Sequence, residues 1–93
     1  MADILHKARN LFPGVTGDVM IVDTGEIEEG DLIFLAGCLI VRALTRPRDR
    51  LVPDGGERRY KYDNEYVDSY GLRQRGWFML DVGQPRLILR PTS

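Results

Sequence analysis

The chain contains few side chains that could act as a nucleophile. Cys38 is its only cysteine and His6 its only histidine. Nucleophilic catalysis requires an activated Ser, Cys or Lys beside a base, and neither Ser69 nor Ser93 lies in a G-x-S-x-G motif. Cys38 lies in an apolar run, where a thiol behaves as a small hydrophobic side chain, and nothing in the sequence places His6 beside it. We therefore expect no enzyme.

Acidic side chains cluster around Gly30, at Glu26, Glu28, Glu29 and Asp31. Carboxylate oxygens could bind a hard cation, but the spacing matches no EF-hand loop. One cysteine and one histidine are too few for a cysteine-based or multi-histidine zinc site, and the glycines of segment 13–17 lack the Lys-Ser/Thr pair of a P-loop. The sequence predicts neither a metal nor a cofactor.

Arginine interleaved with aromatic residues is the pattern with the most functional content. Eleven of the thirteen basic residues are Arg, whose planar guanidinium suits interface ion pairs, phosphate contacts and stacking. They concentrate in segments 46–50, 58–62 and 73–78, of which the last two contain aromatic residues. The candidate binding residues are Arg46, Arg48, Arg50, Arg58, Arg59, Tyr60, Tyr62, Arg73, Arg75 and Trp77.

This pattern has two interpretations. Binders of single-stranded nucleic acid combine basic and aromatic side chains on a β surface, but six acidic residues lie among the clusters and would repel phosphate. Arg, Tyr and Trp are also enriched at protein–protein interfaces. We expect a non-catalytic structural or protein–protein interaction subunit of a homo- or hetero-oligomeric assembly. The alternative is a small nucleic-acid-binding β module.

The two parts of the chain differ in charge although the whole is nearly neutral. The formal net charge is −1, which argues against a uniformly basic nucleic-acid binder. Residues 1–41 carry seven acidic and two basic side chains, whereas residues 42–93 carry seven acidic and eleven basic ones. The resulting charges are −5 and +4. A molecule with an acidic and an Arg-rich face could bind copies of itself or fit between different neighbours.

The N-terminal segment has the apolar period of a helix. Its apolar residues recur on one face of a 3.6-residue repeat, and Pro13-Gly14 ends the pattern. We expect a helix over 2–12 that covers part of a β-rich body over 18–90. A helix of this length is marginal alone in water, so its apolar side must pack on something.

Short apolar runs in the body predict strands. Runs at 18–23, 31–35 and 38–44 are nearly continuous, and a tight turn at Ala36-Gly37 joins the last two. Strands of this kind are usually covered on both faces. The predicted fold class is mainly β, a β-rich α+β domain. It would form a small β-barrel or sandwich of six to seven short strands with one N-terminal helix.

The second half of the chain is less regular. Segment 45–56 contains two Pro and two Gly and predicts a long loop. Segment 57–70 is either a hairpin about Asp63-Asn64, which we prefer, or contains a short helix over 64–70. Two further strands are expected at 77–82 and 86–90, with a turn between them.

Residues 27–35, with the turn I-x-x-G-D, and the following strand 39–44 resemble a stretch of the β-domain of LexA-type self-cleaving repressors. Where that family has its Ser nucleophile this chain has Ile21, and where it has the catalytic Lys this chain has Arg42, which cannot be deprotonated to act as a base. The resemblance implies a β-barrel without this catalytic activity. Similar turns occur in other small β-barrels, so we infer no family membership.

Length and hydropathy limit the remaining possibilities. The 93 residues are enough for one domain, 1–93. The N-terminus lacks the apolar run of a secretory signal, and the longest mostly apolar stretch, 32–44, is shorter than the roughly 20 residues of a membrane-spanning helix. We expect a soluble intracellular protein that binds other protein subunits or, in the alternative interpretation, nucleic acid, and that binds no membrane.

Overall fold

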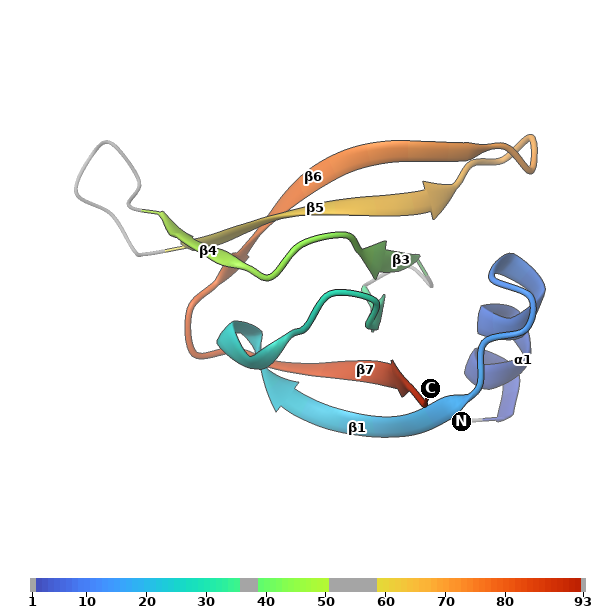
Figure 1. The fold of residues 1–93 in the computed structure, drawn as a ribbon, viewed down its shortest axis with the longest axis horizontal. Coiled ribbons are helices and arrows are strands. Elements are labelled where there is room, and N and C mark those ends of the chain that lie inside the picture. The colour runs from blue at the N-terminus through green and yellow to red at the C-terminus, as the bar shows by residue number, and fades with distance from the viewer. Residues whose placement is uncertain (1, 36–38, 51–58, 93) are drawn as a thin grey trace.

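The computed structural model describes residues 2–35, 39–50 and 59–92 of the chain (Figure 1). These residues form one helix, one short 3₁₀ helix and seven strands. The elements are α1 (Ala2–Leu11), β1 (Gly17–Asp23), η1 (Thr24–Glu26), β2 (Leu32–Phe34), β3 (Ile40–Ala43), β4 (Arg48–Arg50), β5 (Arg59–Val67), β6 (Arg73–Asp81) and β7 (Pro85–Pro91).

All the strand pairs are antiparallel and belong to one sheet. The order is β1-β7-β2-β3-β5, and β5 is shared by three neighbours. Residues 64–66 of β5 pair with β3 and residues 59–61 pair with β4, while the whole of β5 pairs with β6. The strands β3 and β4 therefore lie along one edge of β5, and β6 lies along the other.

The middle strands are covered on both faces, as their nearly continuous apolar sequences predict. On one face Leu32, Ile40 and Leu89 pack against Ala8 and Phe12 from the helix segment. On the other face a second cluster buries the alternate residues of the same strands together with residues of β5 and β6. Its buried members are Ile27, Ile33, Val41, Ala43, Tyr62, Leu80 and Ile88.

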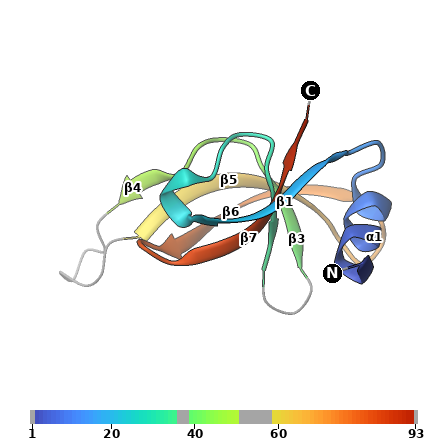
Figure 2. The ribbon, with the colours of Figure 1, turned by 90° about the horizontal axis from the view of Figure 1, so that it is seen from below.

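The helix covers only part of the sheet. In both views α1 lies at the end of the molecule opposite β4 (Figures 1 and 2). We call the sheet face that carries α1 the outer face. Its part over β4, β5 and β6 is left to solvent, and exposed side chains such as Trp77 lie there.

The predicted loop at 45–56 is wrong at its centre, because Arg48–Arg50 form β4. The partner positions along β5 shift by two residues between Ala43↔Asn64 and Arg48↔Lys61. At this break the hydroxyl of Thr45 accepts a hydrogen bond from the amide of Asp63 at 3.1 Å. The Thr45 hydroxyl therefore satisfies the Asp63 amide, which the interrupted ladder leaves without a backbone acceptor. Beyond Pro47 the chain pairs with β5 again. The rest of that predicted loop, 51–56, lies outside the described residues.

Both predictions for segment 57–70 are also wrong. Asp63 and Asn64 lie in the middle of β5, a single strand of nine residues. The turn comes instead at 68–72, where the Asp68 carboxylate accepts hydrogen bonds from the amides of Tyr70 and Leu72, and Gly71 takes the positive φ of 79°. The bond from Leu72, with a further one from the side chain of Gln74, holds the pKa of Asp68 below its ordinary value.

The expected fold class, mainly β with one N-terminal helix, is confirmed. The hairpin of β2 and β3 is confirmed too, since Ile33 pairs with Val41 and the amide of Leu35 donates to the carbonyl of Leu39 at 2.7 Å. Its turn, 36–38, lies outside the described residues. The sheet is not closed: among the residues described, β1 pairs only with β7 and β6 only with β5.

Candidate interaction surface

Cross-strand register brings the basic and aromatic side chains of β4, β5 and β6 onto one surface. Residues directly opposite each other in antiparallel strands point to the same face. Trp77 is opposite Asp63, Met79 is opposite Lys61, and Lys61 is opposite Arg48. We call this surface the β4–β6 face. Its residues are Arg48, Arg59, Lys61, Asp63, Glu65, Val67, Arg73, Arg75, Trp77, Met79 and Asp81.

The structure brings five of the ten predicted binding residues together on the β4–β6 face. They are Arg48, Arg59, Arg73, Arg75 and Trp77. Arg50 occupies the register position opposite Arg59, and Arg58 lies outside the described residues. Arg46 is exposed but belongs to a separate hollow of about 250 Å³ near Glu28 and Arg90.

The two predicted tyrosines point away from the β4–β6 face. Tyr60 and Tyr62 alternate with Arg59 and Lys61 along β5 and so lie on the opposite side of the sheet. Tyr62 is fully buried in the core, which corrects its prediction as a surface residue. Burial raises the pKa of its phenol to about 12, an effect that the nearby Arg86 cation partly opposes.

Acidic residues on the β4–β6 face pair with its arginines. Arg59 lies 3.1 Å from the Asp81 carboxylate, across strands β5 and β6. Arg73 donates a hydrogen bond of 3.1 Å to Glu65. Arg48 is 3.9 Å from Asp63. Arg75 makes no ion pair with the residues that the structure describes. The charges of the face therefore largely neutralise one another.

Apolar surface lies between these ion pairs. The indole of Trp77 is 56% exposed and Met79 is 39% exposed. The ammonium of Lys61 lies 5.0 Å from the Trp77 ring centroid, a distance at which a cation is attracted to the π face. Next to β6 lies a hollow of about 190 Å³. Its lining residues are Leu39, Tyr66, Gly76, Trp77 and Phe78.

Three charged side chains fix the helix segment next to the β4–β6 face. The Arg42 guanidinium is 4.7 Å from the ring centroid of Phe12, which is fully buried, and the Arg73 guanidinium is 6.0 Å from it. Glu65 lies between the two cations, 3.6 Å from Arg42 and 3.1 Å from Arg73. Arg73 therefore has a structural role in addition to its place on the face.

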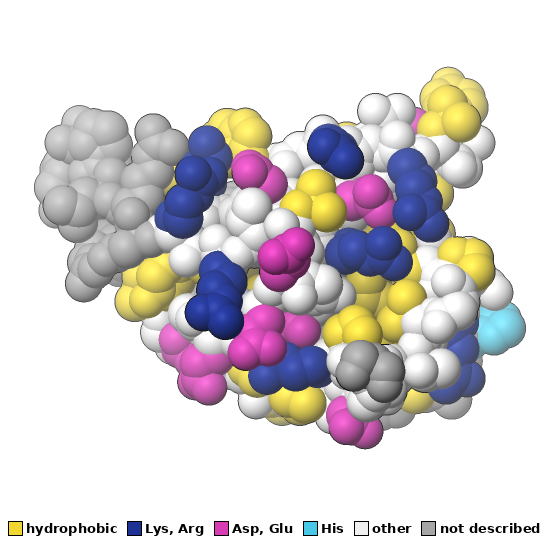
Figure 3. Space-filling model, viewed as in Figure 1, with side chains coloured by type: hydrophobic (Ala, Val, Ile, Leu, Met, Phe, Trp, Pro, Cys, Tyr) yellow, Lys and Arg dark blue, Asp and Glu magenta, His cyan; other side chains and the backbone are white. Residues whose placement is uncertain are grey.

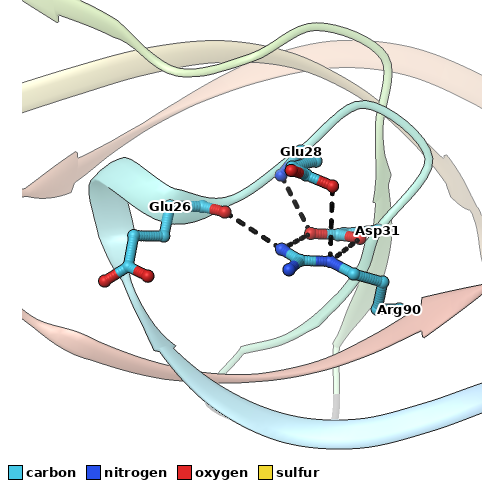
Figure 4. A network of polar contacts seen from close by, with 4 residues as sticks. All are labelled: Glu26, Glu28, Asp31 and Arg90. Atoms are coloured by element: carbon cyan, nitrogen blue, oxygen red, sulfur yellow. Dashed lines mark hydrogen bonds and ion pairs between the residues drawn. The ribbon is translucent and has the colours of Figure 1, made fainter.

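The acidic cluster around Gly30 is a structural turn in which the Arg90 guanidinium binds the Asp31 carboxylate (Figure 4). Asp31 is 1% exposed, and Arg90 donates to its two oxygens at 3.2 and 2.9 Å. Arg90 also donates to the carbonyl of Glu26 at 3.0 Å and lies 3.6 Å from the Glu28 carboxylate. The hydrogen bond to Asp31 raises the pKa of Arg90.

The acidic and basic parts of the chain are joined by ion pairs at Arg90. Arg90, from the basic part, pairs with Asp31 and Glu28 from the acidic part. In Figure 3 basic and acidic side chains lie next to one another over the visible face. The sequence leaves open whether the two parts face apart, and the described side chains of both signs lie side by side on the visible face.

The remaining candidates for chemistry are not brought together. His6 is exposed on α1, and Cys38 lies outside the described residues. Within the described ranges no group of three or more His, Cys, Asp or Glu side chains could hold a metal ion. Ile21 is exposed on β1, while Arg42 packs on Phe12 and pairs with Glu65.

Sequence reasoning did not assign six members of the β4–β6 face to the binding surface: Lys61, Asp63, Glu65, Val67, Met79 and Asp81. The signal was present in β5, where charged residues at 59, 61, 63 and 65 alternate with residues at 60, 62, 64 and 66. Strict alternation is typical of a half-buried strand. It would have placed Lys61 beside Arg59 and placed Tyr62 inside.

No protein-family model matches the chain, and no curated protein or solved structure matches it significantly. The described part of the chain contains no helix that is long and apolar enough to cross a membrane.

Proposed function

We propose that the protein is a non-catalytic interaction subunit that binds another protein subunit through the β4–β6 face. The observation that carries this proposal is the cross-strand register, which places exposed Trp77 and Met79 among arginines on a part of the sheet that α1 does not cover. Aromatic residues, Met and Arg are the types enriched at protein interfaces.

The arrangement resembles the anatomy of a protein interface. Binding energy usually concentrates in a few buried aromatic and Arg side chains, with polar neighbours that exclude water around them. Trp77 lies in the middle of β6, and the neighbouring ion pairs join β4 to β5 and β5 to β6. Burying its exposed surface and that of Met79 would contribute to association, since apolar area stabilises by about 25 cal/mol per Å² before the costs of binding.

The same face supports the nucleic-acid alternative less well. Two features favour it, Lys61 over Trp77 and Arg75, which forms no ion pair with the described residues. Bases stack on aromatic rings, and phosphates bind cations. Asp63, Glu65 and Asp81 lie on this face and would repel phosphate. Protein contacts tolerate such mixed charge, whereas phosphate binding depends on an excess of cations.

Amine-reactive cross-linking tests the proposal, because the chain has only two lysines, Lys7 on α1 and Lys61 on the β4–β6 face. The protein would be cross-linked at native abundance in an extract of the cells that make it. Intermolecular cross-links, located by mass spectrometry, are expected at Lys61.

Two matched variants complete this experiment. Trp77→Ser and Ile21→Ser each remove one large exposed apolar side chain, 56% and 70% exposed, from different strands. Cross-linking through Lys61 is expected to fall at least about fivefold in Trp77→Ser, the loss of about 1 kcal/mol or more typical of a central aromatic, and to persist in Ile21→Ser. Equal cross-linking in both variants, or none through Lys61 in the wild type, would refute the proposed function.

A further inference from the structure

The strand β6 has a free edge along its whole length. Among the residues described, its nine residues pair only with β5. Natural proteins usually protect such an edge with charged side chains, Pro or a bulge. The charges of β6 lie toward its two ends, at Arg73, Arg75 and Asp81, and residues 76–80 are uncharged. The strand contains no Pro, and its register with β5 runs without a bulge from Arg59↔Asp81 to Val67↔Arg73.

We propose that β6 pairs antiparallel with β6 of a second copy of this chain, about a two-fold axis at Trp77. The inference rests on the interaction role proposed above and names the partner as a second copy. Strand addition at an exposed edge is a common mode of recognition, in which the main chain supplies the hydrogen bonds and the side chains select the partner.

The length of the strand selects this register. Trp77 is the central residue of Arg73–Asp81, so an axis there pairs all nine residues with their counterparts. A ladder of this length contains about eight to ten interchain hydrogen bonds. Moving the axis to Gly76 or Phe78 leaves two residues at one end without a partner. The full ladder joins the two sheets into one continuous sheet.

Charge complementarity supports the same register. With the axis at Trp77, Arg73 is opposite Asp81 of the partner subunit, and the symmetric pair forms at the other end. Both side chains are about half exposed, 53% and 44%, and their present partners Glu65 and Arg59 lie on β5. Opposite charges directly across a strand pair are favourable. The β6 strand, basic at its start and acidic at its end, is therefore complementary to itself.

Gly76 of β6 supports the register with its axis at Trp77 independently. In this register Gly76 is opposite Phe78 of the partner subunit, on the face of the sheet where Tyr66 and Phe78 lie. A methyl group built on Gly76 would have the Tyr66 ring as its nearest neighbour, at 3.5 Å, and the hollow of about 190 Å³ begins there. The partner's Phe78 would cover the position that Gly76 leaves without a side chain, an arrangement known to stabilise glycine in sheets.

A charge exchange between two variants tests both the dimer and its register. Sedimentation equilibrium of the 10.6-kDa chain is expected to show a reversible dimer. R73D alone places Asp opposite Asp81 of the partner subunit, and D81R alone places Arg opposite Arg73 of the partner subunit. Each variant is expected to weaken dimerisation at least about tenfold, because two like-charge contacts form per dimer. An equimolar mixture restores both attractive pairs, and a heterodimer is expected at wild-type affinity.

Asp18→Arg is the matched control. It reverses the charge of an exposed residue on β1, which lies at the opposite end of the sheet order and outside the β4–β6 face. It is expected to leave the dimer dissociation constant unchanged within twofold. Circular dichroism and thermal unfolding of each isolated variant establish that it is folded.

Each alternative result is decisive. Wild-type dimerisation of both single variants, or no rescue on mixing, would overturn the register. A series of larger species instead of a dimer would overturn the two-fold arrangement in favour of head-to-tail pairing of different edges. A monomer that still cross-links to another protein through Lys61 would refute self-pairing and leave the proposed function intact. A monomer without such cross-links would refute both.

Discussion

At the scale of single residues, the clearest constraint is the buried carboxylate of Asp31. It accepts two hydrogen bonds from Arg90 and one of 2.9 Å from the amide of Glu28. The backbone of the same turn pairs with Ala43, whose amide donates to Asp31 and whose carbonyl accepts from Gly30. This carboxylate therefore joins the turn before β2 to β3 and to β7, which gives the acidic cluster a structural role.

Removing Arg90 should consequently destabilise the fold. Arg90→Met keeps much of the side-chain volume but leaves the buried charge of Asp31 without a counter-ion. Breaking a buried pair costs about 3–5 kcal/mol, and because Arg90 is 29% exposed we expect about 2–4 kcal/mol. Urea unfolding measures the difference.

Arg59→Met is the matched control for this prediction. Arg59 and Asp81 are both about half exposed, and exposed ion pairs contribute about 0–1 kcal/mol. We expect a correspondingly small effect. Equal losses in the two variants would contradict the assignment of Asp31 as the buried anchor of the turn.

Tyr62 gives a prediction in alkaline solution. Its hydroxyl has no hydrogen-bond partner among the described residues, so Tyr62→Phe should change stability at neutral pH by less than about 1 kcal/mol. The folded pKa, about 12, exceeds the unfolded value of about 10. The resulting stabilisation is complete below pH 10 and is lost as the pH rises through 12.

Unfolding free energies measured from pH 9 to pH 12.5 check this prediction. The wild type should lose about 2–3 kcal/mol more than Tyr62→Phe across that window, which corresponds to the shift of its pKa. The tyrosinate absorbance of the folded wild type should also contain a component near pH 12 that the variant lacks. Identical titrations of the two proteins would show that the Tyr62 phenol is accessible to water.

At the scale of secondary-structure elements, β1 depends on a close approach to β7. A methyl group built on Gly17 would overlap the carbonyl oxygen of Arg90 and lie 2.8 Å from the Cα of Pro91, both of which are backbone atoms. Backbone cannot rotate away as a side chain can. Gly17→Ala should therefore separate the ends of β1 and β7 and destabilise the fold by about 1–3 kcal/mol, the usual cost of overpacking.

Gly76→Ala is the control for the same substitution in β6. Its methyl group would meet only the side chains of Tyr66 and Asn64, at 3.5 and 3.9 Å. Since glycine is unfavourable inside a strand, this variant should be neutral or more stable by about 0.5 kcal/mol. Denaturant unfolding at low protein concentration compares the two, and equal destabilisation would contradict the close approach at Gly17.

The elements also show what the sequence could and could not predict. Apolar runs identified β2, β3 and β7 because these strands bury side chains on both faces, and they also identified β1, whose Ile21 is exposed. The turn of β5 and β6 was misplaced, because Asp63-Asn64 has turn propensity, whereas the observed turn is held by three hydrogen bonds to the side chain of Asp68. The strand β4 was missed because it pairs with β5 only after a break in register, where the amide of Asp63 donates a hydrogen bond to the hydroxyl of Thr45.

The residues of the candidate surface were only partly predictable, because residue types can be read from the sequence whereas strand register cannot. Residue types identified Arg59, Arg73 and Trp77 without structural information. Which of them share a face depends on the register of β5 with β6, and a hairpin turn placed at Asp63-Asn64 removes that register altogether. Tyr62 was therefore assigned to a surface from which it points away.

At the scale of the whole molecule, charge pairing decides between the two proposed kinds of partner. Binding to DNA weakens with salt in proportion to the number of phosphates neutralised. The β4–β6 face carries Asp63, Glu65 and Asp81 among its cations, and the chain as a whole has a net charge of −1. Long-range attraction of a polyanion is therefore weak.

Titration with single- and double-stranded oligonucleotides at physiological salt, followed by fluorescence anisotropy, measures this attraction. The wild type should bind with a dissociation constant above about 0.1 mM, the weak end of non-specific association. The triple variant Asp63→Asn/Glu65→Gln/Asp81→Asn removes the acidic groups and leaves the arginines and Trp77 in place. It should bind at least about tenfold more tightly, because each freed cation can then contact phosphate. Micromolar binding by the wild type, weakened by Trp77→Ser and by added salt, would instead identify the β4–β6 face as a nucleic-acid surface.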